Sequence, residues 1–239
     1  MLTSRPRWPA LLFILGLALL LTALLRDLHF GNAPMQVGQA INGVAAHETG
    51  AANVVASVLL AYRGLDTLGE LAILFAAATG AGLVLGIAFR NGNGEAQAKT
   101  NTEPPAGFIL RKGADLMFPF LLILGAYVIL HGHLTPGGGF QGGAILAAAF
   151  FVPQLARPSS PFNERTAHWV EALAGASFVL IGIAGLAGAG WFLAPLLGTG
   201  SVGELLSAGS IPLLQLAIGL KVGSELAGLM IALHGPKET

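Results

Sequence analysis

Two side chains of opposite charge stand in the middle of an apolar run near the carboxyl end of the sequence. Lys221 and Glu225 are four residues apart, so on a helix they share one face, about 6 Å apart along the axis, with Ser224 beside them. A lysine at the centre of a membrane span costs about 2.5–3.5 kcal/mol on insertion scales. The pair is therefore either an internal ion pair that packs helices together or a step on an ion or proton path.

A second candidate, Glu70, begins another apolar run, in the stretch RGLDTLGELAILF. Thr67, three residues earlier, predicts a capping box, in which the threonine caps a helix and the glutamate reaches back to the cap amide. The alternative is a carboxylate at the mouth of a buried polar path, close to Asp66 and Arg63. Spacing alone favours the capping box.

Two histidines open a glycine-rich turn, HGHLTPGGGFQGG, which runs from His131 to Gly143. His131 and His133 are two residues apart, so on a helix they would point to different faces, which is poor spacing for one metal ion. Histidine titrates near neutral pH, so a role linked to protons is chemically available. The chain contains no phosphate-loop sequence and no nucleophile with a neighbouring base, and we predict no cofactor and no enzyme activity.

The rest of this turn is built from backbone rather than from side chains. Pro136 ends the element that precedes it, and Gly137, Gly138 and Gly139 leave backbone amides open at the start of the next helix. An anion site is one interpretation. Close packing against a neighbouring subunit is the interpretation that we favour. Two more glycines, Gly142 and Gly143, complete the predicted structural turn.

Composition indicates what kind of elements hold these residues. Of the 239 residues, 54% are hydrophobic and 10% are charged, against about a quarter charged in a soluble domain, so lipid is the expected solvent. The 34 glycines fit membrane helices, which use glycine for close approach. The net charge of zero gives no indication of a nucleic-acid partner, and the absence of cysteine excludes disulfides and thiolate chemistry.

Six apolar stretches are predicted to cross a bilayer, which needs about 20 residues for each span. They are residues 8–25, 68–89, 114–130, 140–156, 169–190 and 211–233. The first lacks a small-residue cleavage site, so we interpret it as a retained span and not as a signal peptide. Residues 48–64 are too interrupted for a span and predict a partial or interfacial helix. The sequence thus predicts an all-α, polytopic membrane protein with about six transmembrane helices.

Basic residues divide unequally between the two ends of these spans. One end has only Arg26 and Arg63. The end that holds both termini has nine, namely Arg5, Arg7, Arg90, Lys99, Arg111, Lys112, Arg157, Arg165 and Lys237. By the positive-inside rule both termini are predicted to be cytoplasmic, in the inner membrane of the cell. Residues 91–112 are predicted to be a polar cytoplasmic linker between a two-span module, 1–90, and a four-span module, 113–239.

The turn HGHLTPGGGFQGG and the later GLKVGSE resemble the B subunit of Mrp-type multisubunit cation/proton antiporters, over residues 113–239. Residues 1–90, through NVVASVLLAYRGLDTLGE, resemble the C-terminal end of the large A subunit. Pieces related to these occur as small separate subunits in membrane-bound hydrogenase and sulfur-reductase complexes. The two resemblances together cover nearly the whole chain.

This resemblance implies an accessory or ion-path subunit of a Na⁺/H⁺ antiporter complex, whose partners are large antiporter-like subunits and small membrane subunits. It also implies that Glu70 handles sodium or protons, with Na⁺ bound transiently near it. The family often has Asp where this chain has Ala61, so ion choice or coupling is expected to differ. Two alternatives stay open, namely the same subunit in a redox-driven complex and a purely structural membrane scaffold.

Overall fold

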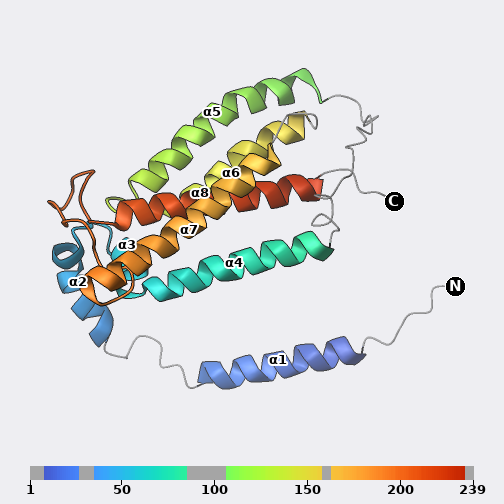
Figure 1. The fold of residues 1–239 in the computed structure, drawn as a ribbon. Coiled ribbons are helices and arrows are strands. Elements are labelled where there is room, and N and C mark those ends of the chain that lie inside the picture. The colour runs from blue at the N-terminus through green and yellow to red at the C-terminus, as the bar shows by residue number, and fades with distance from the viewer. Residues whose placement is uncertain (1–7, 27–34, 85–105, 158–162, 235–239) are drawn as a thin grey trace. The chain divides into compact units, whose positions relative to one another are not determined.

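A computed structural model describes residues 8–26, 35–84, 106–157 and 163–234 (Figure 1). Within these ranges the chain forms α-helices, one short π-helix and connecting loops, without a strand. The chain divides into two compact units, residues 1–40 and 41–239. The prediction of an all-α membrane protein is confirmed for the part of the chain that is described.

The first unit contains α1, Trp8–Arg26. Its sequence is mostly leucine and alanine, which suits both a helix and an apolar solvent. At 1.5 Å per residue its 19 residues extend about 28 Å, close to the roughly 30 Å thickness of the hydrocarbon core. The first predicted span is therefore an apolar helix, as expected.

The second unit contains five helices that are long and apolar enough to cross a membrane. They are α4 (Gly64–Val84), α5 (Phe108–Leu130), α6 (Gly139–Ala156), α7 (Glu164–Ala189) and α8 (Ile211–His234). Figure 1 shows them side by side as a bundle. The helix α8 packs against each of the other four, so its side chains are the best placed to form a buried site.

Three helices begin four or more residues before their predicted spans, and α7 is one of them, since it begins at Glu164 and not at residue 169. Helix α4 begins at Gly64, before residue 68, and helix α5 begins at Phe108, inside the stretch 91–112 that the sequence predicts as linker. Arg111 and Lys112 lie in the first turns of α5, because basic side chains at the end of a span extend toward the interface while the backbone stays helical. Residues 85–105 lie outside the described ranges, so the linker prediction stays untested.

The stretch predicted as a partial helix is a broken one. Helix α2 (Gln36–Thr49) and the pair α3 (Val54–Ser57) and η1 (Val58–Tyr62) are bent by 87° against each other. Thr49 Oγ1 and Ser57 Oγ are 2.7 Å apart across the bend, and the Tyr62 hydroxyl donates to the Glu48 carboxylate. These contacts satisfy the polar side chains of the break locally.

One end of the bundle is closed by irregular chain. There, the start of α3 contacts the turn between α5 and α6. The backbone N–H of Asn53 donates to the His133 carbonyl at 2.9 Å. The loop between α7 and α8 closes on itself through Ala208 N and Thr199 O, 2.7 Å apart, and covers the same end (Figure 1). The last residues of α4 and α6 and the first residues of α5 and α7 lie at the other end of the bundle (Figure 1).

Candidate functional site

The buried ion pair of α8 has the geometry that its spacing predicts. Lys221 Nζ lies 2.8 Å from Glu225 Oε2. The two residues are 8% and 5% exposed, although both are charged in their usual forms. A Cβ on Gly175 of α7 would be 3.5 Å from Lys221 Cδ, an ordinary van der Waals contact, so the lysine stem lies along the α7 backbone. The prediction that the pair shares one face and is buried in the bundle is confirmed.

Helix α7 adds two titratable groups that the sequence analysis missed. Glu171 Oε1 lies 3.4 Å from Lys221 Nζ, and His168 Nδ1 lies 3.7 Å from the other carboxylate oxygen, Oε2. The H-x-x-E spacing near the start of α7 is the signal that could have found them, because residues three apart are neighbours on a helix. Sequence alone does not show that this face of α7 meets Lys221.

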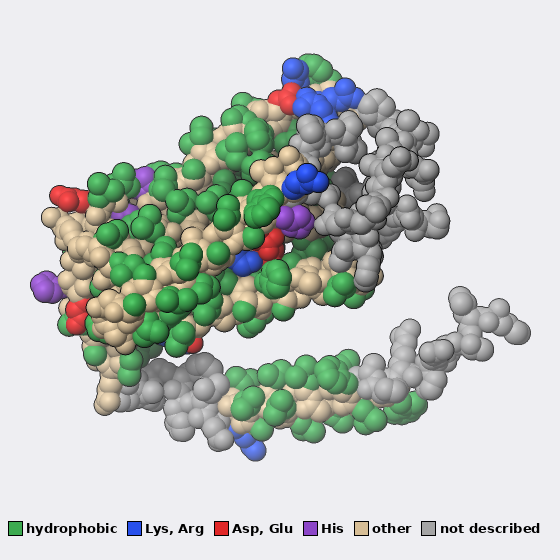
Figure 2. All heavy atoms as spheres, in the orientation of Figure 1, with side chains coloured by type: hydrophobic (Ala, Val, Ile, Leu, Met, Phe, Trp, Pro, Cys, Tyr) green, Lys and Arg blue, Asp and Glu red, His purple; other side chains and the backbone are tan. Residues whose placement is uncertain are grey.

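Helix α4 supplies an aromatic wall to the same site. Lys221 Nζ lies 5.2 Å from the centre of the Phe75 ring, within the range of a cation–π contact. The two parts of the chain that resemble different subunits therefore meet at one ammonium group. Figure 2 shows a mostly hydrophobic bundle surface on which acidic, basic and histidine side chains gather near the middle.

The structure contradicts the capping box at Glu70. Helix α4 begins at Gly64, so Thr67 lies inside the first turn, where its hydroxyl donates to the Leu59 carbonyl at 2.7 Å. Glu70 is exposed and has no hydrogen bond or ion pair within the described residues. Asp66 pairs with Arg63 at 2.5 Å. The carboxylate of Glu70 thus needs an explanation other than capping.

The two histidines of the turn occupy different environments. The His131 ring is stacked on Tyr127, with 4.2 Å between ring centres, whereas His133 is completely buried. The backbones of Glu204 and Leu205 lie close to the His133 ring, yet neither ring nitrogen has a hydrogen bond of good geometry in the described part of the chain. Burial lowers the pKa of His133, because the charged form loses its hydration. The described residues contain no group of three acidic, histidine or cysteine side chains able to hold a metal ion.

The glycines of the turn pack within the chain, which corrects the expected contact with a neighbouring subunit. A Cβ on Gly142 would lie 2.8 Å from the Gly125 carbonyl of α5, and one on Gly143 would lie 2.9 Å from the Gly219 carbonyl of α8. The Gly139 amide donates to the Gln215 side chain, and the Gly138 amide donates to Val128. Glycine is therefore used here for backbone-to-backbone contact between α6 and its neighbours.

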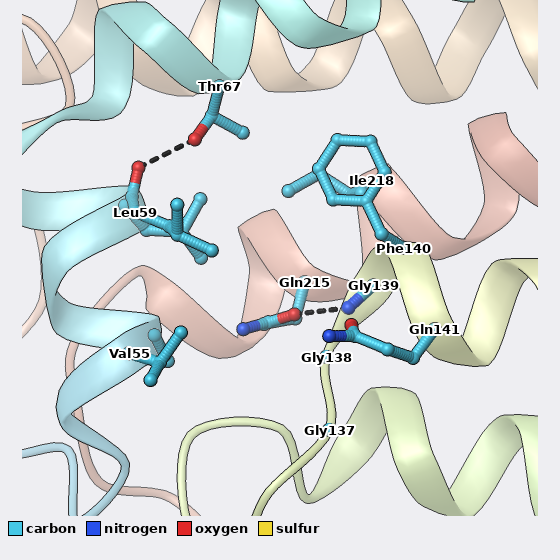
Figure 3. Close-up of a pocket in the computed structure, with 12 residues that line it drawn as sticks. Val55, Leu59, Thr67, Gly137, Gly138, Gly139, Phe140, Gln141, Gln215 and Ile218 are labelled. Atoms are coloured by element: carbon cyan, nitrogen blue, oxygen red, sulfur yellow. Dashed lines mark hydrogen bonds between the residues drawn. The ribbon is translucent and has the colours of Figure 1, made fainter. Parts of the chain in front are cut away.

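A small cavity lies beside this contact. Its volume is about 20 Å³, enough for about one water molecule. Leu59 and Thr67 line it from one half of the chain, and Gly138, Gln141 and Gln215 line it from the other. Figure 3 shows the Gln215 amide pointing at the start of α6. The contact between the two halves of the chain is thus partly polar at this cavity, although most of the residues that line the cavity are apolar.

A single asparagine joins the bent segment to the turn. Asn53 Nδ2 donates to the carbonyls of Gly132 at 2.7 Å and Thr135 at 3.0 Å. Its Oδ1 accepts from Val55 N at 3.0 Å, which caps α3. The backbone N–H of Asn53 donates to the His133 carbonyl, so this N–H and both polar groups of the side chain have hydrogen-bond partners. Local sequence spacing does not reveal this residue, because the acceptors of its side chain are about 80 residues away.

Comparison with known proteins agrees with this arrangement. Residues 109–228 match the model of a domain related to the MnhB subunit of Na⁺/H⁺ antiporters. The chain belongs to this family. The MnhB-related region includes the glycine-rich turn and three of the charged residues described above, Glu171, Lys221 and Glu225. An uncharacterised protein of Methanocaldococcus jannaschii is 33% identical over 220 residues, which cover 84% of this chain and 82% of the relative.

Two solved structures share the fold of this MnhB-related chain. A chain of the membrane-bound sulfane sulfur reductase, an archaeal respiratory membrane complex, is 39% identical with a TM-score of 0.77, and the match covers 95% of this chain and 97% of that one. A chain of the Mrp complex from Dietzia sp. DQ12-45-1b is 26% identical with a TM-score of 0.75, and the match covers 99% of this chain but 27% of that one. The same fold thus occurs as a separate chain and as a part of a larger one.

One further relative also contains the matched region as part of a longer chain. The probable K⁺/H⁺ antiporter A/B subunit of Rhizobium meliloti is 31% identical over 138 residues, which are 51% of this chain and 14% of the relative. This MnhB-related chain therefore spans a minor part of the Rhizobium relative.

Proposed function

We propose that this chain is an accessory subunit of a multisubunit monovalent cation/proton antiporter, and that it contributes to the ion path without a catalytic centre of its own. The main observation behind this proposal is the buried ion pair of α8, in which Lys221 Nζ lies 2.8 Å from Glu225 Oε2. A buried ion pair is weak evidence for stability, because apolar residues of similar volume often stabilise a core equally well or better. Its presence in lipid therefore favours a role in moving charge.

The relatives supply the class of transport. The matching family model describes a domain related to a Na⁺/H⁺ antiporter subunit, and the Rhizobium relative carries the name of a probable K⁺/H⁺ antiporter subunit. The partners are then the large antiporter-like subunits and the small membrane subunits of such a complex. In this proposal Glu70 and Asp66 lie at the mouth of the path, where Na⁺ binds transiently. His131 and His133 stay candidates at the turn.

Transport by the complete complex tests this proposal. We expect inverted membrane vesicles to show Na⁺- or K⁺-dependent proton movement only when this chain is present. Lys221→Gln should reduce that movement by about tenfold or more while the other subunits still co-purify. The control is Lys112→Gln, which removes a lysine near the start of α5. Near-normal antiport by an assembled Lys221→Gln complex would instead support a structural scaffold.

A redox-driven complex is the second candidate, because the sulfane sulfur reductase chain is matched over 97% of its length at 39% identity. The same subunit would then couple electron transfer to ion movement in a larger assembly. Purification of the intact complex under mild conditions separates the two candidates. A redox catalytic subunit found in the complex by mass spectrometry would favour the second, and its absence from a complex active in antiport would favour the first.

Orientation is part of the proposal, with both termini in the cytoplasm. The chain has no cysteine, so single cysteines report on one site each. Leu206→Cys, at a residue that is 90% exposed in the loop between α7 and α8, should react with an impermeant maleimide added outside the cell. Gly94→Cys, in the predicted linker, should react only after the membrane is opened. The reverse labelling pattern would overturn the orientation.

A further inference from the structure

The charges around Lys221 do not balance. Its ammonium lies 2.8 Å from one carboxylate, that of Glu225, and 3.4 Å from a second, that of Glu171. The three side chains are 10%, 3% and 16% exposed. If all three are ionised, one positive and two negative charges give a net charge of −1 within the bundle. An uncompensated charge in an apolar medium is costly, so the cluster favours the uptake of one further cation.

The neighbouring helices do not supply that cation within the described residues. Helix α4 presents the uncharged ring of Phe75, and α6 has no titratable side chain along its whole length. Helix α7 presents one more titratable group, His168, at 3.7 Å from Glu171. The only charged groups on α8 itself at this level are Lys221 and Glu225.

The site also has an unused oxygen. Glu225 Oε1 is buried and has no hydrogen-bond donor within the described residues, whereas its Oε2 is held by Lys221. A buried carboxylate oxygen without a donor is unfavourable, and protonation of the carboxylate removes part of that cost. Both the charge count and this oxygen therefore favour one additional proton.

A proton suits the site better than a metal cation. A bound Na⁺ would lie next to the ammonium of Lys221, and two like charges repel strongly where water is excluded. The cluster offers two carboxylates, and its centre is already occupied by Nζ, at 2.8 Å and 3.4 Å from their oxygens. A proton needs no such space, because it binds on an oxygen.

We propose that Glu171, Lys221 and Glu225 form a binding site for one exchangeable proton, and that His168 delivers it from the edge of the bundle. This inference rests on the proposed function and names the part of the ion path that carries protons. His168 is 66% exposed and Glu171 16% exposed, so the chain of groups leads from the surface inward. His168 Nδ1 gives a proton to Glu171 Oε2. The ammonium of Lys221 gives one of its own protons to Glu225, and the amine that remains takes up the proton from Glu171. Each transfer breaks one bond to hydrogen and forms another.

Infrared difference spectroscopy of the complete complex tests the site directly. As the pH falls without Na⁺, we expect the carbonyl stretch of a protonated carboxylic acid to appear. The band should be lost in Glu171→Gln, which keeps an oxygen acceptor toward Lys221 but removes the excess negative charge. It should remain in Glu204→Gln, the same change at an exposed loop residue. A parent complex without this band, or a band that Na⁺ displaces at constant pH, would overturn the proposal.

The role of His168 has its own test. His168→Ala should slow proton movement by about tenfold, since water only partly replaces a positioned proton carrier. Because the ring is 66% exposed, added imidazole should restore most of the rate. A rate that is unchanged, or reduced without rescue by imidazole, would overturn the role of His168. A parent complex that moves no cation refutes the proposed function instead, and the infrared test still decides whether the proton site exists.

Discussion

The residue at which α4 begins determines whether the Glu70 carboxylate can cap that helix. Because α4 begins at Gly64 and Thr67 donates to Leu59, the glutamate is not part of a cap. Glu70→Gln should therefore leave the fold intact while it removes a negative charge from the side of a membrane helix. We expect cation transport to fall by about tenfold or more with normal assembly.

The neighbouring carboxylate provides the comparison for this prediction. Asp66 is paired with Arg63, so its charge is already compensated. Asp66→Asn should have a weaker effect on transport than Glu70→Gln, measured in the same vesicles. Equal effects of the two variants would contradict a specific role for Glu70.

His133 predicts that the irregular end of the bundle is less stable in acid. Burial holds its pKa below the ordinary value of 6.5, so protonation favours the unfolded turn. Stability is complete above pH 6.5 and falls as the pH decreases toward the lowered pKa, by at most about 1.4 kcal/mol per pH unit. The thermal midpoint of the complex should thus drop between about pH 7.5 and about pH 5.

A substitution tests whether His133 causes this pH dependence of the thermal midpoint. His133→Leu fills a similar volume without a titratable group, so the drop in thermal midpoint on acidification should be smaller. His131→Leu is the matched control, because that ring is only half-buried and is stacked on Tyr127. If the pH dependence of His133→Leu equals that of the parent, the buried histidine is not the cause.

The sequence predicted one part of the charged site and missed the other, for a physical reason. Lys221 and Glu225 lie on one helix, where spacing fixes their separation. Glu171, His168 and Phe75 reach the same place only because α7 and α4 turn particular faces toward α8, which is a property of tertiary packing. The glycine-rich turn was predicted to allow close packing, but its partners in α5 and α8 could not be read from spacing either.

Among the elements, α3 shows how a cap can also join two segments. Asn53→Asp keeps an oxygen for the Val55 amide but replaces the donor to Gly132 and Thr135 with a negatively charged acceptor. Two partly buried carbonyls lose their partner, and each loss costs at most about 1–3 kcal/mol. We expect lower thermal stability and faster proteolysis in the turn that begins at His131.

A second asparagine in the chain provides the control. The Asn163 side chain caps α7 through the Thr166 amide and makes no hydrogen bond to another described helix. Asn163→Asp keeps that cap and should change the stability by less than about 0.5 kcal/mol, since an acidic residue suits a helix N-terminus. Equal losses in the two variants would show that Asn53 acts only as a cap.

Helix boundaries illustrate what hydropathy measures. The predicted spans began at residues 68 and 114, whereas α4 and α5 begin at Gly64 and Phe108. Both extra turns contain charged residues, which lower the local hydropathy without breaking a helix at the interface. Existence and order of the helices were therefore predictable, and their ends were not.

At the scale of the whole molecule, the chain should behave as two modules that recognise each other. Separate expression of residues 1–94 and 95–239 should restore a working complex, because side chains of the two pieces contact each other directly. The contacts of Asn53 and of Phe75 with the second half supply the recognition. Co-purification of the two pieces measures it.

Expression of the chain as two pieces also gives a more sensitive test of the contacts between them. Without a covalent link, Asn53→Asp should reduce recovery of the complex more than it does in the continuous chain. Pieces that are both stably inserted in the membrane but never co-purify would contradict the two-module proposal.

The distance along the chain between Asn53 and its acceptors has a consequence for synthesis. Gly132 follows Asn53 by 79 residues. At roughly 5–20 residues per second, the ribosome needs about 4 to 16 s to make that stretch. During this interval α3 and η1 exist without the carbonyls that will hold them, while α4 is already entering the membrane. The bent segment therefore completes its fold late, by docking onto a turn made after it, and a nascent chain stopped before residue 132 should expose it to protease.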